Sequence, residues 1–342
     1  MTMKRGTMQR IGIVGAGAWG TALALVLHRM VREVVIWAYE REVAQAINRE
    51  HANALYLPGI ALDPAIRAES ELAPVAEADL VLLATPAQHL RACVATLAPR
   101  LGAHVPLVIC TKGIEQQSAA LMSEIVAEAL PRAPLAVLSG PSFASEVAAG
   151  LPTALTLATR DHALGARLVG FLGSPQFRPY LSDDPTGAEI GGAVKNVIAI
   201  ACGIVTGRKL GDNARAALIT RGLAEMARLG LAKGAKAETF MGLSGLGDLS
   251  LTCNGAQSRN FSLGQALGEG RRLEEVLAER RSVAEGVTTA PSVVELARRL
   301  GVDMPISRAV TQVLHEGAAI DATIERLLAR PFKSERLSSA GT

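Results

Sequence analysis

Three glycines near the N-terminus have the spacing of a phosphate-binding turn. They follow an apolar run at residues 11–14 and stand at Gly15, Gly17 and Gly20 in the pattern G-x-G-x-x-G. In such a turn the first glycine permits the bend, the second lets the backbone approach a pyrophosphate, and the third lets the next helix pack closely. Free N–H groups at the start of that helix would bind the phosphates. The alternative is a glycine-rich turn that binds nothing.

A lysine in an apolar run of the second half of the chain could transfer protons. Lys195 lies within residues 191–201, where most of its neighbours are apolar. Burial lowers the pKa of a lysine, and a pKa nearer to neutrality eases proton exchange with a carbonyl group. The alternative is a structural lysine whose long stem reaches the surface.

Two polar stretches further along the chain could complete a site around that lysine. Asp248 follows a glycine-rich turn at residues 242–247, from which its carboxylate could orient the lysine or a substrate hydroxyl. Ser258, Arg259 and Asn260 are consecutive and precede a helical segment. An arginine beside a helix start suits a phosphate, because its fork of donors acts together with the helix dipole. The alternative is an ordinary N-cap formed by Ser258 or Asn260.

The elements that would position these residues differ between the two halves of the chain. In the first half, apolar residues at helical spacing over residues 18–30 alternate with short apolar runs typical of buried strands. The runs are at residues 11–14, 34–37, 78–86, 105–113, 135–139 and 153–159. This alternation predicts an α/β fold with a mostly parallel sheet, whose ligands bind at the carboxyl ends of the strands.

After about residue 180 the pattern is helical, without a convincing strand. The apolar periodic segments are at residues 189–205, 214–231, 291–300 and 306–314. We therefore predict a flexible N-terminal tail over residues 1–10, a Rossmann-type NAD(P)-binding domain over 11–187, and an all-helical substrate-binding domain over 188–342. The active site is expected in the cleft between the two domains.

Composition bears on the partners of the protein. The chain has 342 residues, of which 49% are hydrophobic, so it can bury a large core. Its formal net charge of +3 is small and dispersed, which does not favour nucleic acid as a partner. No uninterrupted apolar run reaches the roughly 18 residues of a membrane span, and the N-terminus lacks the apolar stretch of a signal peptide. We expect no membrane insertion, and Met1, Met3 and Met8 are all candidate translation starts.

Cysteines and histidines do not form the spacings of a metal site. The four cysteines lie far apart without a C-x-x-C pair, and the six histidines form no H-E-x-x-H pair. We therefore predict neither a metal ion nor disulfides, and a reducing cytoplasm as the compartment.

Six motifs together resemble those of the bacterial-type NAD(P)-dependent sn-glycerol-3-phosphate dehydrogenase family. They occur in the same order and cover nearly the whole chain: Gly15-x-Gly-x-x-Gly20, Thr111-Lys-Gly113, Ser139-Gly-Pro-Ser-Phe-Ala144, Gly191-Gly-Ala-Val-Lys-Asn196, Gly245-Leu-Gly-Asp248 and Asn254-x-x-Gln-Ser-Arg-Asn260. The resemblance implies a helical domain like that of 6-phosphogluconate dehydrogenase. It also implies a homodimer that reversibly reduces dihydroxyacetone phosphate to sn-glycerol 3-phosphate with NADPH or NADH, for glycerophospholipid synthesis.

The resemblance also implies roles for individual residues. Lys195 would be the general acid and base of the reaction. The substrate-binding residues would be Lys112, Gly140, Ser142, Lys195, Asp248, Ser258, Arg259 and Asn260. The cofactor-binding residues would be Gly15, Gly17, Ala18, Trp19, Gly20, Tyr39, Lys112, Ala144, Arg259, Val283 and Glu285.

The sequence does not decide between NADPH and NADH. Ala18 stands where the family often has serine, and Tyr39 where members often carry histidine or arginine near the adenosine phosphate. Arg41 could pair with the 2′-phosphate of NADPH, whereas Glu40 could accept a hydrogen bond from the ribose 2′-OH of NADH.

Two other functions are weighed against this reading. A 3-hydroxyacid or 6-phosphogluconate dehydrogenase-like enzyme would share the glycine turn and a catalytic lysine, but the residues at 245–248 and 258–260 argue against it. A non-catalytic dinucleotide sensor would need neither Lys195 nor Asp248.

Overall fold

The protein is described by a computed structural model that covers residues 8–30, 33–279 and 283–331. The chain forms two compact units, each with its own hydrophobic core. The sheet unit contains the described residues up to Thr111, with Ser123–Leu138 and Ser142–Asp183. The helical unit contains Lys112–Met122, Ser139–Pro141 and the described residues from Asp184 onward.

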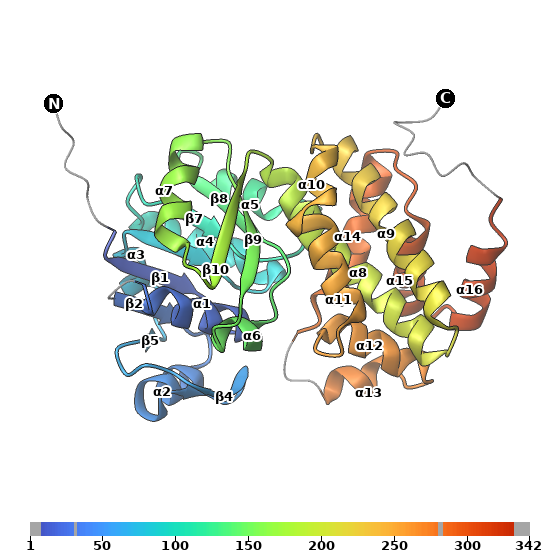
Figure 1. The fold of residues 1–342 in the computed structure, drawn as a ribbon, viewed down its shortest axis with the longest axis horizontal. Helices are drawn as coiled ribbons and strands as arrows, with labels where there is room; N and C mark the ends of the chain where they lie inside the picture. The colour runs from blue at the N-terminus through green and yellow to red at the C-terminus, as the bar shows by residue number, and fades with distance from the viewer. Residues whose placement is uncertain (1–7, 31–32, 280–282, 332–342) are drawn as a thin grey trace. The chain divides into compact units, whose positions relative to one another are not determined.

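An eight-stranded sheet forms the centre of the sheet unit, with the order β10-β9-β8-β7-β6-β1-β2-β5 (Figure 1). The strands are β1 (Arg10–Val14), β2 (Glu33–Trp37), β5 (Arg67–Glu69), β6 (Leu80–Leu83), β7 (Leu107–Ile109), β8 (Leu135–Ser139), β9 (Thr153–Ala158) and β10 (Phe177–Ser182). A separate two-stranded pair consists of β3 (Ala52–Asn53) and β4 (Leu57–Ala61). The helices of this unit are α1 (Ala18–His28), α2 (Arg41–Glu50), α3 (Ala73–Ala76), α4 (Leu90–Leu97), α5 (Met122–Ala129), α6 (Ala144–Ala148) and α7 (His162–Leu172), with short 3₁₀ turns at Ala87–His89 and Ala98–Arg100.

The order of the strands reverses beside β1. This strand pairs in parallel with β2 on one side and with β6 on the other, so that Ile13 lies opposite Ile36 and Leu82. Ligands of open α/β sheets bind at the carboxyl ends of the strands where such a reversal occurs. The glycine turn follows β1 and therefore lies at this position.

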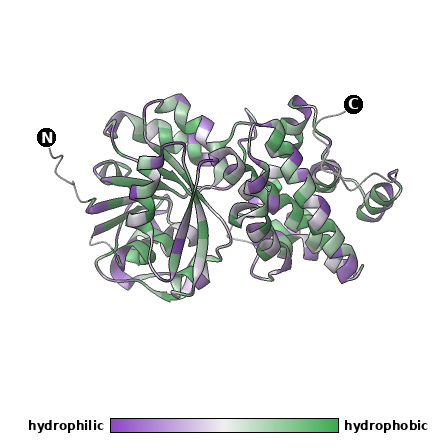
Figure 2. Ribbon diagram, turned by 45° about the horizontal axis from the view of Figure 1, so that its top comes forward, coloured by the Kyte–Doolittle hydropathy of each residue, from purple (hydrophilic) through white to green (hydrophobic). Residues whose placement is uncertain are grey.

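The central strands are buried on both faces, as expected for a parallel sheet covered by helices. Every residue of β6 is buried, and β7 is buried throughout. Figure 2 shows that the strands of the sheet are largely hydrophobic, whereas the helices carry both hydrophobic and hydrophilic residues. This burial explains why β6 and β7 appear in the sequence as continuous apolar runs.

Helix α8 (Pro185–Gly207) forms the core of the helical unit. It is long and apolar enough to cross a membrane, but 83% of its most apolar window is buried within the protein. It packs against α9 (Asp212–Ala232), α10 (Ala237–Met241), a π-helical turn (Leu243–Gly247), α11 (Asp248–Asn254), α12 (Arg259–Gly268), α14 (Glu285–Arg299) and α15 (Pro305–His315). The unit also contains α13 (Leu273–Ala278), which packs on α12, and α16 (Ile320–Leu328), which packs on α15.

The fold class predicted from the sequence is confirmed, and all six predicted strands are present. The β3–β4 pair and the strands β5 and β10 are not predicted by the sequence pattern. Strand β5 has only three residues, and β10 contains Pro179 and exposes alternate residues, so neither forms an apolar run.

The limits of the predicted domains differ from those of the two units. Arg10, placed in the tail, begins β1, and the amides of Gln9 and Arg10 both donate to Asp79 Oδ2, at 2.8 and 3.0 Å. Residues 1–7 lie outside the described residues. At the second limit, Asp184 caps α8 by accepting from the amide of Gly187 at 2.9 Å, so the helical unit begins before residue 188.

Candidate active site

The turn between β1 and α1 has the geometry that its three glycines predict. Gly15 has a φ of +118°, a conformation that favours glycine. A Cβ on Gly20 would lie 1.9 Å from the carbonyl oxygen of Gly15, so α1 can approach the turn only because a side chain is absent there. The space beside Gly17 is open, with no atom within 4 Å of an added Cβ.

The start of α1 is available to an anion. Among the described residues, no side chain caps the helix at Gly17, so the first N–H groups, including those of Ala18 and Trp19, are not satisfied by a capping side chain. The loss of a serine hydroxyl at position 18 leaves these backbone donors in place. The turn therefore fits the pyrophosphate of a dinucleotide.

The end of β2 holds the residues that could distinguish the two nicotinamide cofactors. The Tyr39 side chain is 79% exposed and packs edge-on against Trp37, with ring centroids 6.2 Å apart. Tyr56 donates its hydroxyl to Glu40 Oε1 at 2.7 Å, and burial together with this carboxylate raises the pKa of Tyr56 to about 12. Arg41 is exposed at the start of α2. Both candidate groups are thus present at the strand end.

Two further predicted residues follow β8. Ser142 lies in the loop after this strand, and Ala144 is the first residue of α6. Both belong to the sheet unit.

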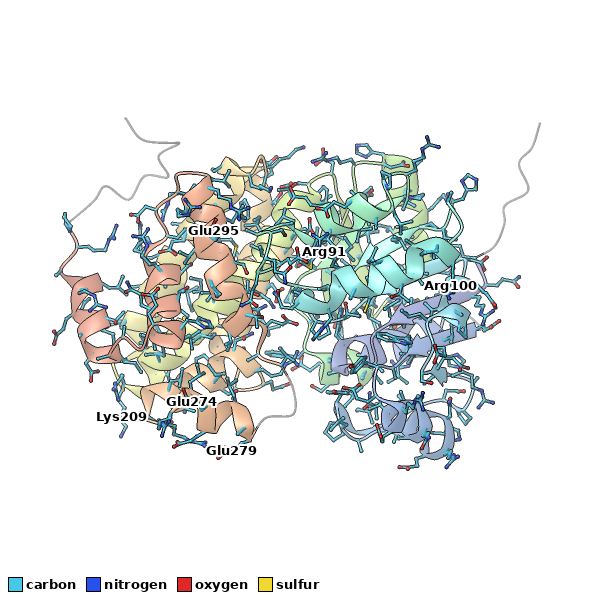
Figure 3. The ribbon with its side chains drawn as sticks, turned by 180° about the vertical axis from the view of Figure 1, so that it is seen from behind. Arg91, Arg100, Lys209, Glu274, Glu279 and Glu295 are labelled. Carbon is cyan, nitrogen blue, oxygen red and sulfur yellow. The ribbon has the colours of Figure 1, made fainter. Side chains whose placement is uncertain are left out.

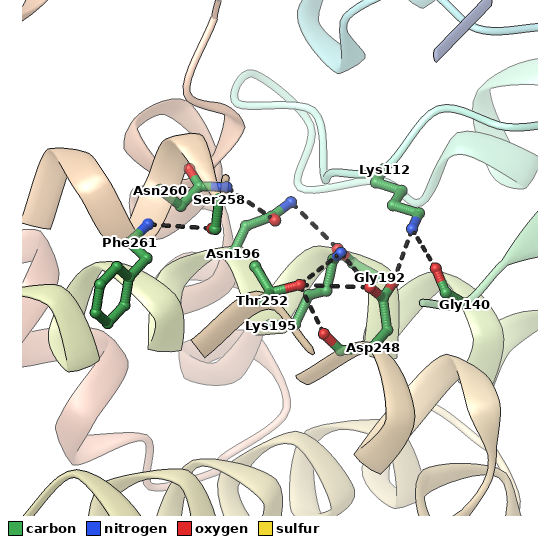
Figure 4. Close-up of polar contacts among 10 residues, drawn as sticks. All are labelled: Lys112, Gly140, Gly192, Lys195, Asn196, Asp248, Thr252, Ser258, Asn260 and Phe261. Carbon is green, nitrogen blue, oxygen red and sulfur yellow. Dashed lines mark hydrogen bonds and ion pairs between the residues drawn. The ribbon is translucent and has the colours of Figure 1, made fainter. Parts of the chain in front are cut away.

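Lys195 is at the centre of a polar cluster in the helical unit (Figure 4). It lies midway along α8, is only 7% exposed, and donates from Nζ to Asp248 Oδ1 at 2.5 Å and to Thr252 Oγ1 at 3.0 Å. The alternative of a structural lysine that reaches the surface does not describe this side chain.

The Asp248 carboxylate binds a second lysine with its other oxygen. Lys112 donates from Nζ to Asp248 Oδ2 at 2.7 Å and to the carbonyl oxygen of Gly140 at 3.0 Å. Asp248 is fully buried, so the cluster places two ammonium groups around one carboxylate with little access to water. The excess of positive charge favours an anionic ligand next to Lys195.

The surroundings of Lys195 tune its acidity. Burial lowers the pKa of Lys195 to about 8; the charge of Asp248 opposes this shift, whereas that of Lys112 adds to it. A lysine with this pKa exchanges protons readily near neutral pH, as a general acid and base requires.

Local glycines allow the cluster to form. A Cβ on Gly191 would lie 2.2 Å from the carbonyl oxygen of Ser244, so α8 packs directly on the π-helical turn. That turn ends at Gly247 and presents Asp248 as the first residue of α11. The glycine-rich stretch predicted as a turn therefore brings an aspartate 53 residues away to Lys195.

A chain of amide hydrogen bonds connects the starts of α12 and α14 with α8. Asn196 Nδ2 donates to the carbonyl oxygen of Gly192 at 3.3 Å, and Asn260 Nδ2 donates to Asn196 Oδ1 at 2.9 Å. The amide of Gly286 donates to Asn260 Oδ1 at 2.9 Å. Ser258 caps α12, because its Oγ accepts from the amide of Phe261 at 3.2 Å, as the alternative sequence interpretation stated.

Arg259 and Glu285 directly precede Asn260 and Gly286, two members of that amide chain. Arg259 is the exposed first residue of α12, and Glu285 is the first residue of α14. The surrounding protein lowers the pKa of Arg259, and the Glu285 carboxylate opposes this effect, so the two charges act on each other. Val283, just before α14, is 45% exposed.

The predicted site residues thus form two groups, one in each unit. The group in the sheet unit forms the turn after β1 and the start of α1, and consists of Gly15, Gly17, Ala18, Trp19 and Gly20. In the helical unit, Lys112, Gly140, Lys195 and Asp248 are joined directly, and Ser258, Arg259 and Asn260 begin the helix that Asn196 anchors to α8.

Thr252 and Asn196 belong to the cluster, although no role is predicted for them from the sequence. Thr252 lies four residues after Asp248 on the same helix, where it donates to the carbonyl oxygen of Asp248 at 2.6 Å and accepts from Lys195. This helical spacing was the available signal for Thr252. Among the described residues, no group of three or more histidine, cysteine, aspartate or glutamate side chains could hold a metal ion.

Comparison with known proteins places this geometry in a family. Residues 10–165 match the N-terminus, and residues 184–325 the C-terminus, of NAD-dependent glycerol-3-phosphate dehydrogenase. A glycerol-3-phosphate dehydrogenase (NAD(P)+) of Parvibaculum lavamentivorans is 58% identical, over 96% of this chain and 98% of the relative. The enzyme of the same name from Caulobacter vibrioides is 56% identical over 96% of this chain and 99% of the relative.

A solved structure agrees with these sequence comparisons. The crystal structure of glycerol-3-phosphate dehydrogenase from Coxiella burnetii is 41% identical and superposes with a TM-score of 0.91, over 94% of this chain and 99% of that chain. The chain belongs to the NAD-dependent glycerol-3-phosphate dehydrogenase family and is an NAD(P)-dependent oxidoreductase.

Proposed function

We propose that this protein reversibly reduces dihydroxyacetone phosphate to sn-glycerol 3-phosphate with NADPH or NADH. The observation that carries the proposal is Lys195, a lysine 7% exposed whose Nζ lies 2.5 Å from Asp248 Oδ1 and whose pKa is near 8. A non-catalytic dinucleotide sensor would have no use for a lysine held in this state. The names of the relatives support the same substrate.

Lys195 acts as the general acid and base. The bound nicotinamide cofactor supplies the hydride that reduces the carbonyl carbon. Lys195 donates its proton to the carbonyl oxygen, and in the reverse direction it removes the proton of the hydroxyl. Asp248 and Thr252 hold Nζ by hydrogen bonds and thereby limit the positions from which the proton is transferred.

The substrate phosphate is bound by the start of α12. Arg259 supplies a fork of charged donors, and Ser258 and Asn260 supply polar groups beside it. Lys112, Gly140 and Ser142 border the reacting end of the substrate. The two lysines around Asp248 add positive charge that attracts the phosphate dianion.

The cofactor is bound mainly by backbone groups of the glycine turn. Gly15, Gly17 and Gly20 shape the turn, and the N–H groups at Ala18 and Trp19 bind the pyrophosphate. Further cofactor contacts are assigned to Tyr39, Lys112, Ala144, Arg259, Val283 and Glu285. Because Glu40 and Arg41 are both at the end of β2, the proposal includes both NADPH and NADH.

The proposal extends to the oligomeric state, the compartment and the use of the product. We infer a homodimer in the cytoplasm that supplies the glycerol backbone of phospholipids. All four cysteines are buried thiols, which agrees with a reducing compartment.

The test is an assay of NADPH and NADH oxidation with dihydroxyacetone phosphate. We expect the wild type to oxidise the cofactor and Lys195→Ala to lose turnover by about 100- to 10,000-fold, the range for removal of a general acid. Lys195→Ala should still bind NADPH, measured by fluorescence. Lys209→Gln, at an exposed lysine after α8, is the control and should retain activity.

Two results would contradict the proposal. A folded wild type that oxidises neither cofactor would refute the enzymatic activity. Near wild-type kcat in Lys195→Ala would instead remove this lysine from the mechanism and leave the reaction itself standing.

A further inference from the structure

A buried asparagine outside the recognised motifs is bonded to the phosphate turn. Asn53 lies in β3 and is 1% exposed. Its Nδ2 donates to the carbonyl oxygen of Ala16 and to Thr21 Oγ1, both at 2.8 Å. Ala16 lies between the first two glycines of the turn, and Thr21 lies in the first part of α1.

The same carbonyl receives a second hydrogen bond. Thr21 is fully buried, and its Oγ1 donates to the carbonyl oxygen of Ala16 at 3.3 Å. Asn53 and Thr21 therefore both donate to Ala16 O, and Asn53 also orients the threonine hydroxyl. These bonds account for both protons of the Asn53 amide nitrogen.

The orientation of this carbonyl determines what the turn presents on its other side. The Ala16 carbonyl and the Gly17 N–H belong to one planar trans peptide, so they point in opposite directions. With the carbonyl held by Asn53 and Thr21, the Gly17 N–H points away from them. Rotation of this peptide would direct a carbonyl oxygen toward the anion site, and Gly17 is free to rotate because it has no side chain.

The asparagine is itself held in place. Its Oδ1 accepts from the amide of Tyr56 at 3.2 Å, within the segment that connects β3 and β4. Burial of a side-chain amide carries a desolvation cost, which its hydrogen bonds must offset. In Asn53 both the nitrogen and the oxygen of the amide have hydrogen-bond partners.

We propose that Asn53 is a positioning residue that holds the Ala16–Gly17 peptide in the orientation that binds the dinucleotide pyrophosphate. The inference deepens the proposed function and depends on its cofactor site. Asn53 makes no contact with the reacting atoms and acts through the backbone of the turn. Its effect is the same for NADPH and NADH, since both carry the same pyrophosphate.

The experiment measures cofactor affinity in Asn53→Ala. We expect the Kd of NADPH and that of NADH each to rise by about tenfold, as for loss of one or two buried hydrogen bonds. The kcat at saturating cofactor and the KM for dihydroxyacetone phosphate should change less than about twofold, since the general acid is untouched. Binding of adenosine 2′-monophosphate, which has no pyrophosphate, should also be unchanged.

Asn48 provides a matched control in the same unit. Its carboxamide makes two hydrogen bonds to the backbone of Ala68, at 2.7 and 3.0 Å, and does not contact the turn. Asn48→Ala should lower the melting temperature as Asn53→Ala does but leave the Kd of both cofactors unchanged. An equal loss of affinity in Asn48→Ala would reduce the role of Asn53 to general stability and overturn the inference.

A second pair of variants tests the same peptide without altering Asn53. Thr21→Val removes the second donor to Ala16 O and should weaken both cofactors, whereas Thr21→Ser keeps the hydroxyl and should restore their affinity. This pair decides the question if Asn53→Ala fails to fold. An unchanged Kd of both cofactors in Asn53→Ala would overturn the inference, while the enzyme would remain active. If Asn53→Ala does not fold, an unchanged Kd in Thr21→Val would overturn it in the same way. A wild type that binds neither dinucleotide would instead refute the proposed function.

Discussion

At the scale of single residues, the Asp248 carboxylate holds Lys195 in its protonated form. Burial lowers the pKa of Lys195 to about 8, and Asp248 keeps it from falling further. Reduction of dihydroxyacetone phosphate requires the charged lysine, so the kcat of reduction should fall as pH rises through about 8. The kcat of the reverse oxidation should rise over the same pH range. In Asp248→Asn we expect the pKa of Lys195 to fall, which moves the decline in reduction to lower pH.

The measurement is kcat for dihydroxyacetone phosphate reduction between about pH 6 and 10, in both proteins. Glu274→Gln is the control, because this exposed carboxylate on α13 should leave the profile unchanged. If the profile of Asp248→Asn coincided with that of the wild type apart from its height, Asp248 would not set the acidity of Lys195.

At the scale of elements, α8 and α12 pack closely because glycines meet at their contact. A Cβ on Gly203 would lie 2.1 Å from the carbonyl oxygen of Phe261, and one on Gly264 would lie 2.0 Å from that of Ile200. The backbones are therefore in direct contact. This packing also carries function, because α8 contains Lys195 and α12 begins with Arg259.

We predict that Gly264→Ala destabilises the protein by about 1–3 kcal/mol, the range for overpacking a dense core, and more if the helices separate. Gly170→Ala on the exposed side of α7 is the matched control, since an added Cβ meets no atom within 4 Å there. That change should stabilise by about 0.5–1 kcal/mol through helix propensity. Urea unfolding of both variants tests the difference, and equal effects would show that the close contact does not limit stability.

Elements with strong local signals could be predicted from the sequence, and others could not. The glycine turn, α1 and the strands β1, β6 and β8 each carry a local pattern of apolar spacing or glycine. Strand β10 has no such pattern, because it interrupts its apolar residues with Arg178 and Pro179. Its place in the sheet depends on pairing with β9, which is a tertiary interaction.

The glycine turn, Lys195, Asp248 and residues 258–260 could be singled out from local patterns, but the roles of the other site residues came from a resemblance. No local pattern joins Lys195 to Asp248, which are 53 residues apart, or Lys112 to Asp248, which are 136 residues apart. Asn53 was missed for the same reason, since its bonds to Ala16 and Thr21 span more than 30 residues. Such contacts exist only after the elements have packed.

At the scale of the whole molecule, several charged side chains of the surface pair with one another. Figure 3 labels several of them, including Glu279, directly after α13, and Glu295 on α14. Glu295 binds Arg298 and Arg299, which lower its pKa to about 2, and Glu279 binds Arg271 at 2.6 Å. Such exposed pairs contribute little to stability. Buried carboxylates should therefore determine how the free energy of unfolding changes with pH to a greater extent than these exposed ion pairs do.

Glu225 is the carboxylate for which this expectation is sharpest. It lies on α9, is 1% exposed, and accepts from the amides of Ile306 and Ser307 at the start of α15, at 2.6 and 3.1 Å. Burial raises its pKa to about 7 despite these bonds. The folded protein thus binds a proton more tightly at Glu225 than the unfolded chain does.

The proton bound at Glu225 determines the direction in which stability changes with pH. The stabilising contribution is fully present below the unfolded pKa of about 4.5 and is lost as pH rises through about 7, with a slope of at most about 1.4 kcal/mol per pH unit. Glu225→Gln cannot titrate, so its free energy of unfolding should lack this decline, although the variant is less stable at low pH because an amide nitrogen faces backbone donors. Urea unfolding at several values between about pH 5 and 8 measures both slopes. Parallel slopes in the two proteins would show that Glu225 keeps its ordinary acidity, and the hydrogen bonds from α15 would then fully offset the effect of burial on its pKa.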